Sequence, residues 1–174
     1  MIRSNRIAPS IVLGLLAGVA LASNVHLKGR STPAFTDQGL VLNATASLTG
    51  LGEGDILVLL SARANATANC CNPSGSCKVP GQNPAPVNVS GSESIPASEV
   101  RNGNVTFSVT TNGPTSPVPG APDCPAASWR ENITDLAFTS GTITVMQGGS
   151  TVLTLRCTFS SPTTDGPVQN VTCS

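Results

Sequence analysis

Charged and aromatic side chains are scarce in this sequence. Only 10% of the 174 residues are charged and 3% are aromatic, tyrosine is absent, and there is one histidine. Nine basic residues balance nine acidic ones without a basic run, so nucleic acid and anionic membranes are not expected as partners. After the N-terminal segment, no stretch approaches the roughly 20 apolar residues of a membrane helix, so no span is expected there.

The shortage of titratable groups also limits catalysis. A Ser-His-acid triad needs a rigidly held histidine, and His26 lies in an aperiodic N-terminal stretch. Glu131 and Asp135 are the only two acids in one expected strand and, four residues apart, should share a face, as a glycosidase pair would. Glu53 and Asp55 fit a hairpin turn better than a calcium site, which needs six to eight ligands. We therefore expect no enzyme, metal or cofactor.

The first 22 residues have the features of a secretory signal peptide. Arg3 and Arg6 precede a twelve-residue apolar run, Ile11 to Ala22, and Ala20-Leu21-Ala22 fits the small-x-small cleavage pattern. Cleavage there leaves residues 23–174 with seven basic and nine acidic residues. Residues 23–38 are polar and aperiodic, which predicts a flexible arm. Residues 39–174 are expected to form one domain.

A period of two dominates the rest of the chain. In the run from Ile56 to Cys71 the even positions are apolar, and from Ser61 onward the odd positions are polar, as in a half-buried strand. About seven such runs, separated by Gly/Pro/Asn turns, predict an all-β, two-sheet antiparallel sandwich with an immunoglobulin-like architecture. A change of parity between Trp129 and Phe138 predicts a bulge near Asp135.

Six cysteines in an exported chain indicate disulfides. Strand phase points Cys70 inward and Cys71 outward, so these neighbours cannot easily share a partner. Cys71 reaches Cys77 across a turn-forming pentad. We then expect Cys70 to pair with Cys124 and Cys157 with Cys173, one of 15 pairings that six cysteines allow.

Six asparagines begin Asn-x-Ser/Thr triplets without proline: Asn43, Asn65, Asn88, Asn104, Asn132 and Asn170. Strand phase places them on or beside polar positions, so all six are expected to be accessible. If the host is eukaryotic, several should carry N-glycans; in a bacterium most would stay bare.

Two proline-rich loops, residues 72–86 and 113–127, and the single tryptophan are the remaining features. Such loops either present a surface or simply connect strands. Trp129 follows the second loop and either packs in the core, as its type favours, or is the aromatic of a binding patch.

Several motifs resemble a family of small exported microbial proteins rich in Thr, Ala and Gly. They are Ser47-Leu48-Thr49-Gly50-Leu51-Gly52-x-Gly54-Asp55, the segment from Pro80 to Val87 (PGQNPAPV), Ser94 to Glu99 (SIPASE), and Val171-Thr172-Cys173. The resemblance implies export and an all-β fold but no activity. The pair Cys71 and Cys77 departs from its pattern.

The sequence thus predicts a secreted, non-catalytic β-sandwich with a cell-envelope, matrix or surface-interaction role. The alternative is a carbohydrate-binding module centred on Trp129 and the proline-rich loops. A small glycoside hydrolase using Glu131 and Asp135 is the third interpretation. The expected partner is a cell-wall or extracellular glycan or protein.

Overall fold

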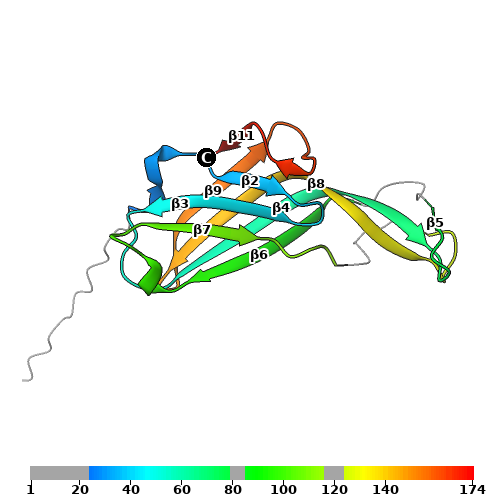
Figure 1. Cartoon of the computed structure of the whole chain (residues 1–174), viewed down its shortest axis with the longest axis horizontal. Coiled ribbons are helices and arrows are strands. Elements are labelled where there is room, and N and C mark those ends of the chain that lie inside the picture. Colours follow the sequence, from blue (N-terminus) through cyan, green and yellow to red (C-terminus); the bar gives the residue numbers. More distant parts are fainter. Residues whose placement is uncertain (1–23, 79–84, 116–123) are drawn as a thin grey trace, which may run out of the picture.

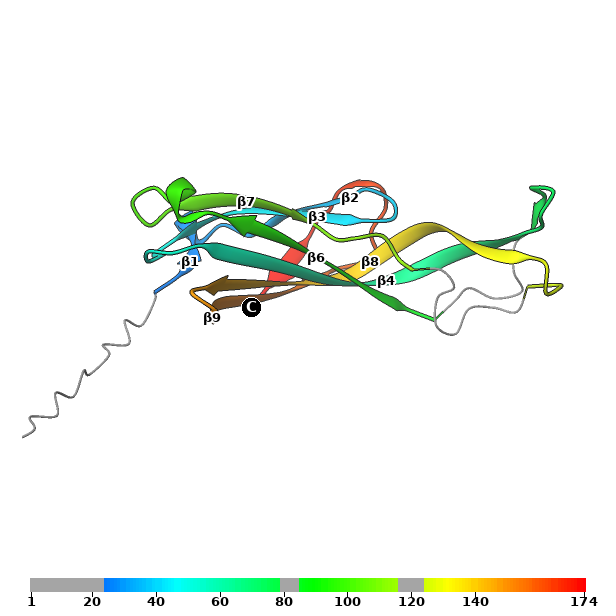
Figure 2. The same cartoon turned by 90° about the horizontal axis from the view of Figure 1, so that it is seen from below.

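The computed structural model describes residues 24–78, 85–115 and 124–174. Within these ranges the chain forms two antiparallel sheets packed face to face (Figures 1 and 2), which confirms the expected all-β sandwich. The helical turns in these ranges are η1 (Lys28–Arg30) and η2 (Ala97–Glu99), and neither is long or apolar enough to cross a membrane. The expected signal peptide, residues 1–22, lies outside the described residues.

The smaller sheet, sheet A, is built around β3. Both β1 and β2 pair with one edge of β3 and β7 pairs with the other, while β10 pairs with β2. Its strands are β1 (His26–Leu27), β2 (Ala34–Asp37), β3 (Leu42–Thr49), β7 (Val105–Thr110) and β10 (Gly166–Pro167).

The larger sheet, sheet B, is built around the two longest strands, which pair with each other along their length. β4 also pairs with β6 and β5, and β8 also pairs with β9, which in turn pairs with β11. Its strands are β4 (Ile56–Cys71), β5 (Cys77–Lys78), β6 (Val87–Ile95), β8 (Arg130–Gln147), β9 (Ser150–Phe159) and β11 (Val171–Cys173). β8 is one continuous strand, because bulges and not turns interrupt its alternation.

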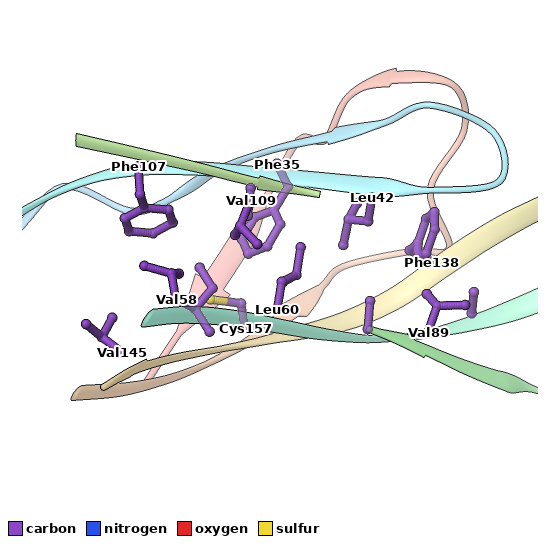
Figure 3. Packing of buried hydrophobic residues seen from close by; sticks show 14 of the residues in the cluster. Phe35, Leu42, Val58, Leu60, Val89, Phe107, Val109, Phe138, Val145 and Cys157 are labelled. Carbon is purple, nitrogen blue, oxygen red and sulfur yellow. The ribbon is translucent and has the colours of Figure 1, made fainter. Parts of the chain in front are cut away.

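Alternation along β4 is as regular as its sequence predicts. Every even residue from Ile56 to Cys70 is buried, and the odd residues are exposed or half-buried. Side chains on this buried face meet those of sheet A, and Figure 3 shows Phe35, Leu42, Phe107 and Val109 facing Val58 and Leu60 across the core.

The two sheets lie close together where β6 passes β7. A Cβ on Gly91 would lie 1.9 Å from the carbonyl oxygen of Thr110, so only glycine fits at this crossing. The carbonyl of Ser90 accepts hydrogen bonds from the backbone N–H of Asn112 (2.9 Å) and from its side-chain amide (3.1 Å). This corner thereby covers part of the edge of β6.

The expectation that residues 23–38 form a flexible arm is wrong for the described part of this segment, which begins at Asn24. Val25 and Phe35 belong to the core, and β1 and β2 pair with β3. The ring of Phe35 packs edge-on against Phe159, with centroids 5.2 Å apart. Strands of two and four residues are too short to show a period, so their pairing with β3 is what orders them.

Candidate functional site: the disulfide-linked tip of the β4–β8 ribbon

The central strands of sheet B continue beyond the sandwich as a two-stranded ribbon. β6 accompanies β4 only from Ile56 to Ala64, whereas β8 pairs with β4 as far as Cys71. Figures 1 and 2 show the ribbon, residues 65–71 and 130–137, extending away from sheet A with β5 at its far end.

Two bulges in β8 shape the ribbon. The register with β4 shifts between Arg63 and Ala64 and again between Thr67 and Ala68, which leaves Thr139 and Thr134 as the extra residues. Each of these threonines donates its hydroxyl to a carbonyl of β4, at 3.2 Å in both cases. Bulges increase twist and bend the strand, so these two direct the ribbon out of the sheet. The second one is the bulge expected near Asp135.

Two disulfides hold the tip of the ribbon. Cys71 bonds to Cys77 across β4 and β5, and Cys70 bonds to Cys124, which belongs to the second proline-rich loop. The third disulfide, Cys157–Cys173, joins β9 to β11. All three pairs are those expected from strand phase. No disulfide bond between described residues joins sheet A to sheet B, unlike the cross-sheet bridge of an immunoglobulin domain.

The loop between β4 and β5 is closed by its own hydrogen bonds. Asn72 donates its backbone N–H to the carbonyl of Ser76 at 2.9 Å, and its side-chain oxygen accepts from the N–H of Ser76 at 2.8 Å. The N–H of Gly75 donates to the Asn72 carbonyl at 3.0 Å. Together with the adjacent disulfide, these bonds give the tip a fixed shape. Residues 79–84 and 116–123 of the two proline-rich loops lie outside the described residues.

Trp129 lies at this tip and not in the core. The expectation that it packs in the core, as its residue type favours, is therefore wrong. It is half-buried, and the ammonium nitrogen of Lys78 lies 5.8 Å from its ring centroid. A cation over an indole face is an attractive arrangement. The tip therefore combines an aromatic ring, a cation and hydrogen-bonding groups in one place.

The carboxylates proposed for catalysis lie on opposite faces of β8. Glu131 pairs with the buried Cys70, whereas Asp135 pairs with the exposed Thr67, because the bulge at Thr134 separates them. The expectation that they share a face is therefore wrong. A glycosidase pair must face one cleft, which this arrangement does not provide.

The other candidate groups take structural positions. His26 is exposed on β1, with Nδ1 2.7 Å from the carbonyl oxygen of Asn24. Asp55 accepts a hydrogen bond from the N–H of Ala97 at 2.9 Å, which fixes the start of η2. In the part of the chain that the structure describes, no three His, Cys, Asp or Glu side chains are arranged to hold a metal ion.

A buried carboxylate that the sequence does not reveal lies where the two sheets meet. Asp37, on β2, is 2% exposed; it accepts the hydroxyl of Thr163 and, at 2.9 Å, the N–H of Gly39. Burial raises the pKa of Asp37 above the usual 3.8, the two hydrogen bonds oppose the rise, and the charges of Asp135 and Asp165 add to it. The only sequence signal is its alternation with Phe35 in a segment that otherwise reads as a loose arm.

The six sequons divide into two groups. Asn65, Asn88, Asn132 and Asn170 are exposed as expected. Asn43 and Asn104 are half-buried, and their amide nitrogens, the atoms that a glycan would join, donate to neighbouring groups at 2.8–3.4 Å. The expectation that all six are accessible is therefore wrong for these two.

Comparison with known proteins identifies no relative, since no family model, no curated protein and no solved structure matches this chain. The resemblance to exported microbial proteins remains a prediction.

Proposed function

We propose that this chain is a secreted, non-catalytic protein of the cell envelope or extracellular matrix that acts by surface contact through the tip of the ribbon. The observation that carries the proposal is that two of the three disulfides described fix a tip that lies beyond the sandwich core. Bridges at such a place preserve the shape of an exposed surface more than they support core packing. Three disulfides also fit an oxidising extracellular setting.

The alternative is that the contact is with carbohydrate. Sugar-binding sites commonly pair an exposed aromatic face with a polar rim. Trp129, with Lys78 over its ring, lies at the same tip as the polar residues Asn72 and Ser76 and has this composition. One half-buried indole offers a single stacking platform, so this alternative predicts weak binding of one or two sugar units.

A glycan array and a binding assay on isolated cell-wall material, each with wild-type protein and Trp129→Ala, test both versions. The carbohydrate version predicts array binding that Trp129→Ala weakens by about tenfold or more, since stacking and desolvated contact area are lost together. The surface-contact proposal predicts binding to cell-wall material that Trp129→Ala also weakens by about tenfold or more, and no binding to the glycan array. Leu40→Ala, a large exposed apolar residue on the sandwich, is the control. Binding that Trp129→Ala leaves unchanged in both assays would contradict the role of the tip.

N-glycosylation is a further proposal for a eukaryotic host. The four exposed sequons would carry glycans, whereas Asn43 and Asn104 would stay bare because their amide nitrogens are engaged. Mass spectrometry of material secreted by the native host, before and after glycosidase treatment, tests this. An unchanged mass, or glycans at Asn43 and Asn104, would contradict it.

A further inference from the structure

The outer face of sheet B is an ordered array of hydroxyl groups. Strand register places its side chains in rows that cross β6, β4, β8 and β9. The strands of sheet B form the lower layer in Figure 2. One row contains Ser92, Leu59, Thr144 and Thr154, the next contains Ser90, Ser61, Thr142 and Arg156, and the third contains Asn88, Arg63, Ser140 and Thr158. These three rows contain no carboxylate.

A shallow groove of about 390 Å³ runs over the first two rows. Its lining includes Ser61, Ser90, Ser92, Thr142 and Thr144, with the half-buried Leu59 among them. Hydroxyl groups around a small apolar surface suit a sugar ring, which presents hydroxyls at its edge and C–H groups on its face.

Two cations border this groove. Arg63 and Arg156 are exposed on the same face, and register places them about 12 Å apart, two strands and one side-chain repeat away from each other. In the described ranges neither guanidinium has an ion pair or a side-chain hydrogen bond. A guanidinium binds a carboxylate through two parallel hydrogen bonds, so each arginine is available to hold one acidic group.

We propose that the outer face of sheet B binds an acidic polysaccharide, with its carboxylates on Arg63 and Arg156 and its hydroxyls in the Ser/Thr groove. The charge of the face selects this ligand, because a neutral glycan would leave both guanidinium groups without partners. Farther along, the outer face of the ribbon carries Arg130 and one carboxylate, Asp135, whose charges offset each other, so the excess of positive charge is confined to the three rows. This surface is separate from Trp129, and the proposal for it does not depend on whether the tip binds a partner.

Two exposed sequons flank the same site. Asn88 pairs directly with Arg63, and Asn65 is the next outward residue of β4 after Arg63. A glycan on either asparagine would cover the guanidinium group. Polysaccharide binding and N-glycosylation therefore exclude each other on this face, and the protein that binds is the unglycosylated one.

The test measures binding of unglycosylated, disulfide-bonded protein to polygalacturonate and to its fully methyl-esterified form, which differs only in charge. We expect binding to polygalacturonate at low salt, loss on esterification, and loss at about 0.5 M salt, where the screening length is a few ångströms. The double variant Arg63→Gln/Arg156→Gln should bind at least about tenfold more weakly, since two charge-assisted contacts disappear. Trp129→Ala should bind like wild type, which separates this site from the tip.

Lys28→Gln/Arg101→Gln is the matched control. It makes the same change in net charge at exposed residues off this face, so it should stay within about twofold of wild type. Equal binding to the esterified polymer, wild-type binding by the Arg63/Arg156 variant, an equal loss in the control, or no binding by the wild type would each overturn the proposal. Urea unfolding of every variant verifies that folding is unchanged.

Discussion

Thr163→Val tests whether the contact between the two sheets depends on one hydroxyl. This hydroxyl donates to the carboxylate of Asp37 in sheet A and accepts the backbone N–H of Phe138, in β8 of sheet B, at 2.8 Å. Thr163 is 8% exposed, and Asp37 and Phe138 are almost fully buried. Valine keeps the shape of threonine and removes only these two hydrogen bonds.

The expected loss follows from what valine leaves behind. A buried N–H without a partner costs about 1–3 kcal/mol, and a hydrogen bond to a charged group contributes about 1.5–3 kcal/mol. We therefore expect Thr163→Val to lower the free energy of unfolding by about 3 kcal/mol in urea titrations at pH 7. The control, Thr164→Val, alters an exposed neighbour and should change it by about 0.5 kcal/mol or less. A loss below about 1 kcal/mol in Thr163→Val would refute the reasoning.

The variant Asp37→Asn tests how the stability contributed by this site depends on pH. Because burial raises the pKa of Asp37, the folded state holds this proton more tightly than the unfolded state does. The contribution of Asp37 to stability is therefore complete below pH 3.8 and is lost as the pH rises through the raised folded pKa. Asparagine mimics the protonated acid, so the stability of wild type relative to Asp37→Asn should fall across this window as pH increases. A constant difference from pH 3.5 to 8, or a rise, would contradict this account.

Two further substitutions test packing. Gly91→Val should lower the free energy of unfolding by about 2 kcal/mol or more, because its Cβ would meet the backbone of Thr110. Gly113→Ala, where an added Cβ would lie 3.9 Å from the nearest atom, the carbonyl oxygen of Leu40, should change it little. Phe35→Ala should cost about 3–5 kcal/mol, as for a core aromatic, and the exposed Leu40→Ala about 0.5 kcal/mol or less; a small loss at Phe35 would restore the flexible-arm interpretation.

The sequence by itself determined the strands whose side chains alternate over many residues. In β4 the even positions are apolar over the whole strand and the odd positions are polar from Ser61 onward, so the buried face and the opposite directions of Cys70 and Cys71 are local properties. The disulfide pairing followed from those directions together with the short distance along the chain to Cys77. The bulge in β8 was visible as a change of parity for the same reason.

Only the tertiary structure decided which short segments become strands and where polar groups are buried. β1 and β2 are ordered by pairing with β3, a contact that leaves no periodic signal in two or four residues. Asp37 is buried because Thr163, 126 residues away in sequence, supplies its partner. Glu131 and Asp135 separate onto two faces because the bulge falls between them, and Trp129 stays outside the core because the ribbon extends beyond sheet A. Each outcome depends on contacts between residues distant in sequence, whereas local alternation records only which face of a strand a side chain occupies.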